Sequence, residues 1–441
     1  MLPRPRPVLR IESDRSLHLP SANDAGFAHA CKPVAALDRP MKRASPQKVA
    51  CSFAARLVDW QRIAGRSGLP WQGTRDPYRI WLSEIMLQQT QVSTVIPYYL
   101  RFLERFPDVQ ALAAAPLDDV LAAWSGLGYY SRARCLHRAA CQVVDEHSGI
   151  FPREFAAVLA LPGIGRSTAG AICAFAFGQR HAILDGNVKR VLARHAGIEG
   201  WAGDPPVLAA LWAESVARLP PAVDEADAPG VDDRGAPAVD ETDAPDAAGA
   251  GQTEIGTYTQ ALMDLGAGPC ARSRPRCGDC PVSTDCVARL SGRIEAIPAP
   301  RPRREMPHRA SAVWLLLDSE RGVLLERRPP SGIWGGLWSL PQAIDAQVEA
   351  SIRASDGALQ ALAPIEHAFT HFRLRIEPLL VRMHRVQDAG AALQAHDGES
   401  GRRWVALEQL ESVALPAPVR TLLETLRNGG AGLQPRLPGL S

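Results

Sequence analysis

The chain has 441 residues, of which 46% are hydrophobic and 22% are charged. This length predicts two to four domains, and the apolar content suffices for large cores, which excludes global disorder. The formal net charge is only +2, but it is uneven along the chain: the stretch 221–250 holds nine acids and one base, which leaves 48 bases and 38 acids elsewhere. A basic body with an acidic insert makes a polyanionic partner worth testing.

Other features of the composition narrow the class further. The nine cysteines are too sparse for a disulfide scaffold, and no apolar run approaches the roughly 18 residues of a membrane span. The N-terminus has arginines but not the apolar core of a secretory signal. We therefore expect a soluble, cytoplasmic protein in a reducing compartment.

Taken in chain order, the hydrophobic pattern predicts two domains of different kinds. Apolar residues recur at helical spacing from Val49 to about Gly200 and again from Tyr258, which indicates an all-helical domain. Beyond a linker rich in proline and arginine, short apolar runs separated by the turn-rich segment P-P-S-G-I-W-G-G indicate a mixed α/β domain. Its predicted strands are Ala312–Leu317, Val323–Arg327 and Phe369–Val381.

Composition also sets the expected boundaries. An imperfect repeat, P-A-V-D-E-A-D-A-P and P-A-V-D-E-T-D-A-P, cannot bury a core and is expected to interrupt the helical domain as a solvated loop. In order, we expect a disordered extension at 1–47, the helical domain at 48–294 with a disordered acidic insert at 221–251, the linker at 295–308, the α/β domain at 309–430 and a disordered tail at 431–441.

Four cysteines cluster in the spacing C-x6-C-x2-C-x5-C, at Cys270, Cys277, Cys280 and Cys286. Thiolates so close together can surround one metal centre. Zinc is one reading, although zinc ribbons usually carry two short C-x2-C knuckles and this loop has one. The spacing resembles the [4Fe-4S] loop of the endonuclease III superfamily of DNA glycosylases, which implies an iron–sulfur cluster. Basic residues suited to phosphate contact, unless they are merely solvated, are Arg272, Arg274, Arg276, Arg132, Arg134, Lys189 and Arg190.

A glycine turn lies between two predicted helices, in L-P-G-I-G-R-S-T-A-G (161–170). Gly163 and Gly165 allow a tight turn and expose amide groups that can bind an anion. Alone this is an ordinary helix–helix connection, but together with the cysteine loop it resembles the helix–hairpin–helix of DNA glycosylases. In relatives that also cleave the DNA backbone, a lysine stands in place of Ser167 and forms a Schiff base with the sugar. Serine cannot, which implies a monofunctional glycosylase.

Two carboxylates have surroundings suited to acid–base chemistry. Glu84, in L-S-E-I-M-L-Q-Q-T-Q (82–91), lies on a largely apolar helix face, where desolvation would raise its pKa and permit proton donation near neutral pH. Asp185 precedes a predicted helix, where a cap position would keep the carboxylate ionised to face a developing cation. The alternatives are a glutamate at the rim of an amphipathic face and an ordinary helix cap.

These motifs together resemble one family. L-S-E-I-M-L-Q-Q-T-Q, G-L-G-Y-Y-S-R-A-R (126–134), the glycine turn, D-G-N-V-K-R (185–190) and the cysteine loop occur in the order and spacing of the MutY adenine DNA glycosylases. The resemblance implies that Glu84 protonates adenine N7 and then assists the water that completes hydrolysis. It also implies that Asp185 stabilises the oxocarbenium-like sugar and that Asn187 supports the polar network.

The same resemblance implies contacts with DNA, because the base must leave the duplex before it can be cleaved. Tyr129 and Gln89 would fill the gap as wedge residues. Gln88 and Thr90 would lie near the opposite base, and Trp71 would form part of the adenine pocket. Large aromatic side chains such as Tyr129 and Trp71 are otherwise most often core residues.

Val313–Ser441 resembles the Nudix-like C-terminal domain of this family, which reads 8-oxoguanine opposite the adenine. A hydrolytic Nudix domain needs a glutamate-rich helix to hold Mg²⁺, whereas the corresponding segment contains only Glu349, so pyrophosphate hydrolysis is not expected. The family's F-S-H recognition turn corresponds to Phe369, Thr370 and His371, in which threonine keeps the hydroxyl and adds a methyl group. An ordinary strand residue is the alternative for His371.

We therefore expect a monofunctional DNA glycosylase of base excision repair that hydrolyses the N-glycosidic bond of adenine mispaired with 8-oxoguanine or guanine in duplex DNA. It is expected to carry a [4Fe-4S] cluster and to act as a monomer, without a membrane. A pyrimidine glycosylase with lyase activity is disfavoured by Ser167 and by the second domain. A non-enzymatic iron–sulfur DNA-binding protein would not need Glu84 and Asp185 together, and a nucleotide pyrophosphatase would need the missing glutamate-rich helix.

Overall fold

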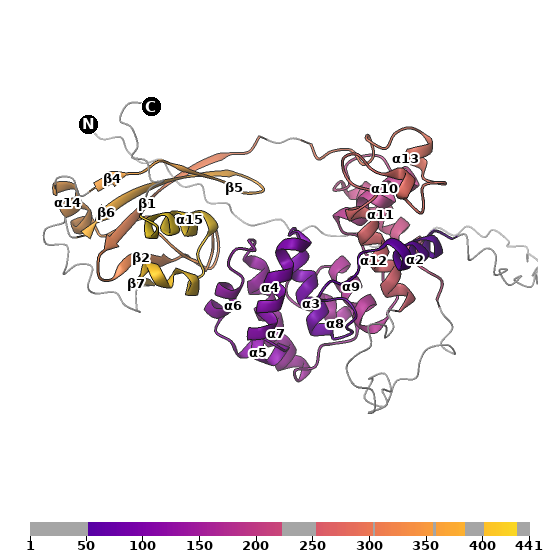
Figure 1. Ribbon diagram of the computed structural model, residues 1–441, viewed down its shortest axis with the longest axis horizontal. Helices are drawn as coiled ribbons and strands as arrows, with labels where there is room; N and C mark the ends of the chain where they lie inside the picture. The colour runs from indigo at the N-terminus through magenta and orange to yellow at the C-terminus, as the bar shows by residue number, and fades with distance from the viewer. Residues whose placement is uncertain (1–51, 223–252, 303–304, 356–358, 384–400, 430–441) are drawn as a thin grey trace, which may run out of the picture. The chain divides into compact units, whose positions relative to one another are not determined.

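The computed structural model describes residues 52–222, 253–302, 305–355, 359–383 and 401–429. The expected extension at 1–47, the acidic insert from residue 223 onward and the tail at 431–441 lie outside the described residues. The described part consists of a helical domain followed by a domain built on one sheet (Figure 1), which confirms the predicted fold class. Within these ranges, no helix is both long and apolar enough to cross a membrane.

Capping side chains fix the starts of several helices in the first domain. Ser52, Asp76, Asp108, Asp185 and Thr253 each precede a helix and accept a hydrogen bond from an amide group of its first turn. The helices are α2 (Phe53–Ala64), α3 (Pro77–Leu87), α4 (Val92–Arg105), α5 (Val109–Ala114), α6 (Leu117–Ala123), α7 (Ser131–His147), α8 (Phe155–Ala160), α9 (Arg166–Phe177), α10 (Gly186–Ala196), α11 (Pro205–Ala217), α12 (Glu254–Ala267) and α13 (Val287–Leu290).

The helical domain has two hydrophobic cores. Helices α3 to α9 enclose the first core, around the fully buried Trp81. Helices α2, α10, α11 and α12 form the second, which contains the buried Tyr258. Helix α9 contributes to both, since Ile172 packs in the first core and Ala171 in the second. Helix α3 belongs to the first core and helix α10 to the second, so residues of these two helices can meet where the cores adjoin.

The second domain is a seven-stranded sheet. Strand β1 pairs in parallel with β6, and the other pairs are antiparallel, in the order β3-β2-β1-β6-β4, with β5 also on β6 and β7 also on β2. The strands are β1 (His308–Asp318), β2 (Gly322–Arg327), β3 (Trp338–Ser339), β4 (Leu359–Ala361), β5 (Ile365–Ala368), β6 (Arg373–Arg382) and β7 (Arg402–Val405).

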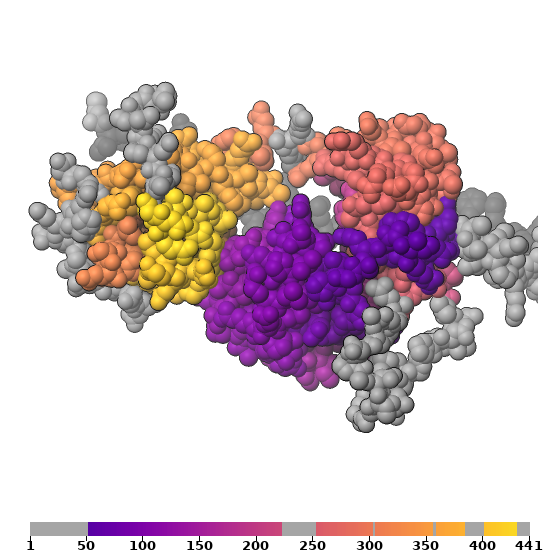
Figure 2. Space-filling view, in the orientation of Figure 1, coloured from indigo at the N-terminus to yellow at the C-terminus, as the bar shows by residue number. Residues whose placement is uncertain are grey.

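Both faces of this sheet are covered by a helix. Val313 and Leu315 of β1 belong to the core under α15 (Ala417–Arg427), whereas the alternate residues Trp314 and Leu316 belong to the core under α14 (Ala346–Ala354). The yellow surface of α15 lies against the orange strands in Figure 2. This arrangement gives three layers, helix on sheet on helix, as expected of a mixed α/β domain.

One predicted strand is wrong at its start. The pattern placed a strand at Phe369–Val381, but β6 begins at Arg373. Phe369–Phe372 is a turn between β5 and β6, in which the Phe369 amide donates to the Phe372 carbonyl at 2.9 Å. Because aromatic and β-branched residues favour strands, a turn of this composition has the signature of a strand in the sequence.

Candidate active site

Helix α3 positions Glu84. The side chain of Asp76 caps its start by accepting a hydrogen bond from the Tyr78 amide, and Pro77 occupies its first turn. The residues around Glu84 on this helix are almost all buried in the first core. Glu84 itself is only half-buried and lies on the wall of a cavity, so its carboxyl group is desolvated yet accessible.

Asp185 caps helix α10, where its Oδ1 accepts a hydrogen bond from the Val188 amide at 2.7 Å. Burial raises the pKa of Asp185, against hydrogen bonds from the amides of Val188 and Asn187 and the positive charges of Arg190 and Lys189, which lower it. The expectation that capping by itself keeps this carboxylate ionised is therefore incomplete, because desolvation has the larger influence.

The two acids influence each other. Burial, and after it the negative charge of Asp185, raise the pKa of Glu84 to about 8. The upward shift expected for Glu84 is present, and at neutral pH this carboxyl group keeps its proton. The amides and cations around Asp185 favour its charged form. When Asp185 is ionised, its negative charge favours the protonated form of Glu84.

A cavity of about 440 Å³ has both acids on its wall. Asn187, Trp71 and Thr90 lie on the same wall, so the structure brings together five residues expected from the sequence. Leu69, Leu87 and Met263 add apolar surface to this lining. A space of this size, lined by polar and apolar side chains together, can accommodate a planar base beside the acid of Glu84.

Two further residues of this wall, Arg66 and Gln260, were missed in the sequence. Both donate hydrogen bonds to Oδ1 of Asp264, from Arg66 Nε at 2.7 Å and from Gln260 Nε2 at 2.9 Å. Asp264 is only 3% exposed. The signal that could have revealed them is the placement of Gln260 and Asp264 one helical turn apart within the largely apolar helix α12, which buries two polar groups on one face.

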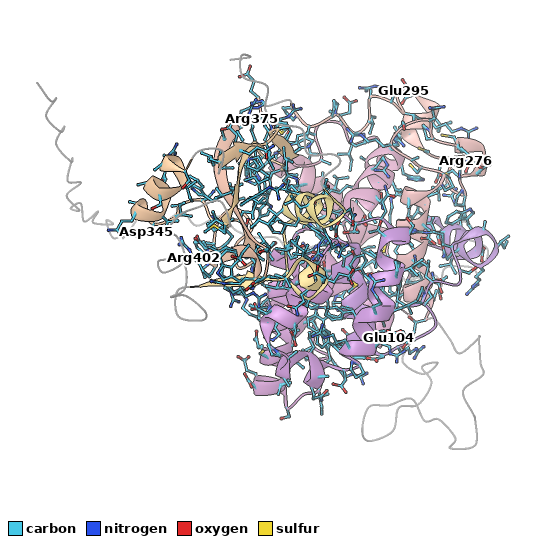
Figure 3. All side chains as sticks on the ribbon, turned by 60° about the vertical axis from the view of Figure 1, so that its left-hand side comes forward. Glu104, Arg276, Glu295, Asp345, Arg375 and Arg402 are labelled. Carbon is cyan, nitrogen blue, oxygen red and sulfur yellow. The ribbon has the colours of Figure 1, made fainter. Side chains whose placement is uncertain are left out.

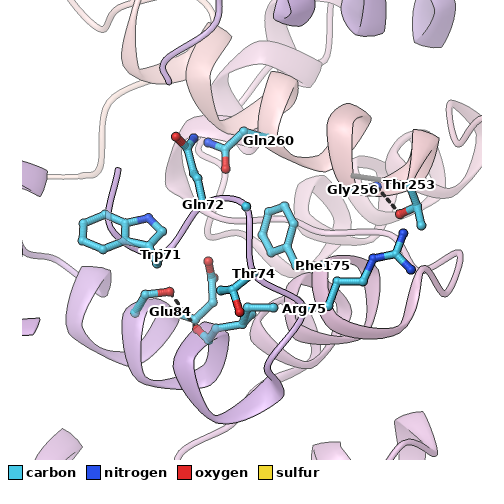
Figure 4. Close-up of a pocket in the computed structure, with 12 residues that line it drawn as sticks. Trp71, Gln72, Thr74, Arg75, Glu84, Phe175, Thr253, Gly256 and Gln260 are labelled. Carbon is cyan, nitrogen blue, oxygen red and sulfur yellow. Dashed lines mark hydrogen bonds between the residues drawn. The ribbon is translucent and has the colours of Figure 1, made fainter. Parts of the chain in front are cut away.

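A second, smaller cavity also borders Glu84 (Figure 4). It measures about 30 Å³ and is lined by Thr74 and Phe175 together with Trp71 and Gln260, which border both cavities. A volume of this size is enough for a water molecule. Glu84 therefore borders two cavities, one large enough for a planar base and one large enough for a water molecule.

Two tight turns carry the expected wedge residues. Gln89 has a φ of 60° and is exposed, and Tyr129 has a φ of 49° and is 46% exposed. Tyr129 is thus not a core residue, whereas Trp71 is buried at 8% exposure and still borders the large cavity. Gln88 and Thr90 flank Gln89 and are half-buried. The large cavity is lined by Thr90 but not by Gln88, Gln89 or Tyr129.

The glycine turn joins α8 to α9. Gly163 has a φ of +82°, and a Cβ there would lie 2.6 Å from the Cβ of Cys135, so both the backbone and the available space require glycine. Gly165 is exposed and precedes the first turn of α9. Behind it, the Ser167 hydroxyl accepts a hydrogen bond from the Leu184 amide at 2.9 Å. Ser167 therefore binds the segment that leads directly into Asp185.

The four cysteines line one cavity together with the buried Arg194. The Arg194 guanidinium donates to the Cys270 sulfur at 3.5 Å, and the Cys286 thiol donates to the Arg194 carbonyl at 3.4 Å. Burial, with the neighbouring cysteines, raises the pKa of Cys280 to about 11. In the described part of the chain, no group of three or more His, Cys, Asp or Glu residues stands in a metal-binding arrangement. The donor set fits a thiolate-bound metal, because four cysteines line one cavity whose charged lining residues are the arginines Arg194 and Arg289.

Exposed arginines surround the cysteine loop. Arg272, Arg274 and Arg276 are all exposed, and Arg276 projects outward from the loop (Figure 3). Arg276 also forms an ion pair with Asp279 at 2.9 Å, with both side chains mostly in solvent. This surface is accessible to a polyanion.

In the sheet domain, the turn at 369–372 presents the residues expected to recognise a base. Phe369 stacks on Phe372 with ring centroids 4.4 Å apart, whereas Thr370 and His371 are exposed. The alternative of an ordinary strand residue is wrong for His371, since it lies in the turn before β6. Glu349 lies on α14 and pairs with Arg353 of the same helix.

Comparison with known proteins agrees with this two-domain arrangement. Residues 82–215 match the model of the HhH-GPD superfamily of base excision DNA repair proteins, and residues 312–425 match that of the NUDIX domain. A solved structure of a thermostable thymine-DNA glycosylase covers 54% of this chain and 95% of its own, at 24% identity and a TM-score of 0.42.

Two full-length relatives are closer in sequence. The adenine DNA glycosylase of Buchnera aphidicola subsp. Baizongia pistaciae is 31% identical over 85% of this chain and 97% of its own length. The human adenine DNA glycosylase is 30% identical over 86% of this chain and 75% of its own length. The chain therefore belongs to the adenine DNA glycosylases, enzymes of base excision repair that hydrolyse N-glycosidic bonds in DNA.

Proposed function

We propose that this enzyme removes adenine from duplex DNA where the adenine is mispaired with 8-oxoguanine or with guanine. The observation that carries the proposal is the presence of Glu84 and Asp185 on the wall of one cavity, with the pKa of Glu84 raised to about 8. A protonated acid and an ionised carboxylate on the two sides of a glycosidic bond are what its hydrolysis requires.

In the proposed reaction Glu84 donates a proton and later regains one, whereas Asp185 acts through its negative charge. Glu84 donates its proton to N7 of adenine, the bond between C1′ and N9 breaks, and its electron pair leaves with the base. Asp185 faces the positive charge that develops on the sugar. A water molecule then adds to C1′ and gives its proton to Glu84, which restores the acid. The smaller cavity beside Glu84 supports this last step, because solvent can reach the carboxylate there.

Asn187 is proposed to hold this polar network in place. Its Oδ1 accepts a hydrogen bond from Nη2 of Arg190 at 2.9 Å, and the same Nη2 donates to the Gly266 carbonyl at 2.6 Å. Arg190 thereby connects α10 to α12 beside Asp185, so that the carboxylate and the cavity wall keep a fixed distance.

We infer that one copy of the enzyme binds one duplex. Tyr129 and Gln89 are exposed and are proposed to fill the gap left by the extruded adenine, with Gln88 and Thr90 near the opposite base. Trp71 borders the cavity of Glu84 and is proposed to contact the adenine ring there.

The turn at Gly163 and Gly165 and the arginines of the cysteine loop are proposed to bind phosphates.

Recognition of 8-oxoguanine is assigned to the turn Phe369–His371. The support is that Thr370 and His371 are exposed at a turn that the stacking of Phe369 on Phe372 holds in place. The threonine hydroxyl and the imidazole both offer hydrogen bonds to a base edge.

We propose that the four cysteines hold a [4Fe-4S] cluster, as in the family. Such a cluster would supply rigidity to the arginine-bearing loop. The purified protein is expected to absorb near about 400 nm, where thiolate-to-iron bands fall. A colourless protein that contains zinc would assign the site to zinc instead.

The absence of a lysine at Ser167 supports hydrolysis without backbone cleavage. Ser167 has no amine to form a Schiff base, and its hydroxyl is engaged with the Leu184 amide. Borohydride is expected to trap no covalent adduct with DNA, and efficient trapping would assign a lyase activity.

The function is tested by single-turnover excision from duplexes that contain adenine opposite 8-oxoguanine or guanine. The native enzyme is expected to release adenine from both, and Glu84→Gln to lose at least about a hundredfold in rate, since the amide cannot donate the proton. Glu104→Gln is the matched control, because Glu104 is an exposed glutamate of helix α4 and should behave as the native enzyme. Robust excision by Glu84→Gln would refute the assignment of the acid.

A further inference from the structure

Arg132 is a buried arginine whose guanidinium binds two separate turns. Its position in the sequence suggested contact with phosphate, but the residue is only 8% exposed. Nη1 donates to the carbonyl oxygens of Ile85, Met86 and Gln88 at 2.9, 2.8 and 2.6 Å. Nη2 donates to Oγ1 of Thr90 and to the carbonyl oxygens of Leu127 and Gly128 at 3.1, 3.3 and 3.2 Å.

The three acceptors of Nη1 lie at the C-terminal end of α3, the helix that bears Glu84. Ile85 and Met86 belong to the last turn of α3, and Gln88 caps it, so these carbonyls have no amide partner further along the helix. A cation at this place also complements the negative end of the helix dipole. Arg132 therefore fixes where α3 stops and how the chain leaves it.

Both turns held by this side chain contain a residue with a left-handed backbone. Gln89 lies between two of the acceptors and has a φ of 60°, and Tyr129 follows the other pair and has a φ of 49°. A left-handed backbone is unfavourable for residues with a Cβ, so surrounding contacts must hold it. The guanidinium also lies over the rings of Trp124 and Tyr129, each at 5.4 Å from the ring centroid. Arg132 touches both the backbone and the ring of the Tyr129 turn.

Lysine could not replace this arrangement. An ammonium group is a compact donor with three hydrogens at one atom, whereas the two Nη atoms of arginine carry four hydrogens, which are shared among acceptors in two directions. Burial lowers the pKa of Arg132 to about 10, so the group remains charged near neutral pH. A positively charged guanidinium therefore donates to backbone carbonyls of both turns.

We propose that Arg132 is a positioning residue that joins the Gln89 turn and the Tyr129 turn to each other and to the helix of Glu84. The inference rests on the proposed function, in which Gln89 and Tyr129 replace the extruded base. One side chain then sets the spacing between the two wedge residues and the acid, so that the turns need no rearrangement when DNA binds.

The test separates base extrusion from chemistry. A duplex carries 2-aminopurine at the adenine position opposite 8-oxoguanine, and its fluorescence rises when the base leaves the stack. Fluorescence is read in the Glu84→Gln background, so that the base stays attached, and adenine excision is read separately at saturating enzyme. Arg132→Lys is expected to reduce both the fluorescence rise and the excision rate by about tenfold to a hundredfold.

Two control variants distinguish positioning from stability. Arg138→Lys makes the same exchange at an exposed position of helix α7 and should match the native enzyme. Val143→Ala shortens a buried side chain of the same helix, three turns further along, and is expected to lower the melting temperature without changing the two turns. If Val143→Ala and Arg132→Lys lose extrusion equally at equal loss of melting temperature, the positioning role is refuted.

A milder variant keeps the test open if Arg132→Lys fails to fold. Thr90→Val removes one acceptor of Nη2 while keeping the shape of the side chain, and Thr90→Ser retains the hydroxyl. Reduced extrusion by Thr90→Val and recovery in Thr90→Ser support the proposal, and equal extrusion by the two overturns it. A native enzyme that neither extrudes nor excises adenine refutes the proposed function as well, whereas native behaviour of Arg132→Lys refutes this inference alone.

Discussion

The cavity between the two helical cores and the turn Phe369–His371 of the sheet domain place their polar groups in opposite surroundings. Glu84 and Asp185 are surrounded by buried side chains, and burial is the main cause of the raised pKa of each. Thr370 and His371 stand in solvent at the end of a strand. The difference fits the tasks proposed for the two regions, because proton transfer needs a desolvated acid, whereas reading a base edge needs accessible donors and acceptors.

Changes in the cavity should therefore affect activity strongly, and changes in exposed turns should affect it weakly. The largest expected effect comes from Asp185. Asp185→Asn keeps a good helix cap but loses the charge, so excision should fall by about a hundredfold to a thousandfold at nearly unchanged stability. Asp185→Ala should lose activity similarly and also about 1 kcal/mol of stability, because it removes the cap.

Single-turnover rates and thermal melting of the two variants separate these contributions. Asp185→Asn with full activity would show that the charge is not needed. The role of Asp185 would then be to cap helix α10.

The next effect concerns a turn that is exposed but conformationally demanding. Gly163→Ala forces a Cβ to 2.6 Å from that of Cys135 at a φ of +82°, and we expect it to destabilise the protein. The loss should be about 1–2 kcal/mol in unfolding free energy. Gly165→Ala is the matched variant, since nothing lies within 4 Å of its Cβ position. It should cost about 0.5 kcal/mol through a poorer helix cap. Equal melting temperatures would mean that the hairpin is not strained at Gly163.

Glu84 should also reveal itself in stability. Its pKa of about 8 in the folded chain lies above the ordinary value of 4.5, so between these pH values the unfolded chain releases a proton that the folded chain retains. Native Glu84 thus lowers stability increasingly from pH 4.5 up to about pH 8. Glu84→Gln is expected to melt a few degrees above the native enzyme at pH 7 and equally near pH 4, as thermal scans can measure. A lower melting temperature at pH 7 would show that the carboxyl group is not desolvated.

The smallest effect is expected at Thr370. Thr370→Ser removes one exposed methyl group, so unfolding free energy should change by less than about 0.5 kcal/mol. The preference for adenine opposite 8-oxoguanine over adenine opposite guanine should rise by less than about tenfold. Competition between the two duplexes measures this ratio, and an unchanged ratio for Thr370→Ala as well would show that the side chain of Thr370 takes no part in recognition.

The sequence could predict what depends on local pattern. The helical and sheet domains, the cap at Asp185 and the apolar surroundings of Glu84 all follow from spacing within one element. Four of the six hydrogen-bond acceptors of Arg132 lie more than forty residues away along the chain, so periodicity could not indicate them. The same holds for Arg66, whose partner Asp264 lies on a distant helix.

Electrostatic balances were predictable only in part. Burial and capping act in opposite directions on Asp185, and their relative size depends on how deeply α10 packs against its neighbours. The turn at Phe369 was predicted as strand because its residues have strand propensity, while the pairing of β5 with β6 decides where the chain reverses.

The pH dependence of single-turnover excision tests the central claim most directly, that Glu84 is a protonated acid with a pKa of about 8. The native enzyme should excise adenine from the duplex with 8-oxoguanine at a constant rate around neutral pH. Above about pH 8 the rate should fall by about tenfold per pH unit as Glu84 loses its proton. A rate that stays constant to well above that value, or residual excision by Glu84→Gln that follows the same profile as the native enzyme, would contradict the account.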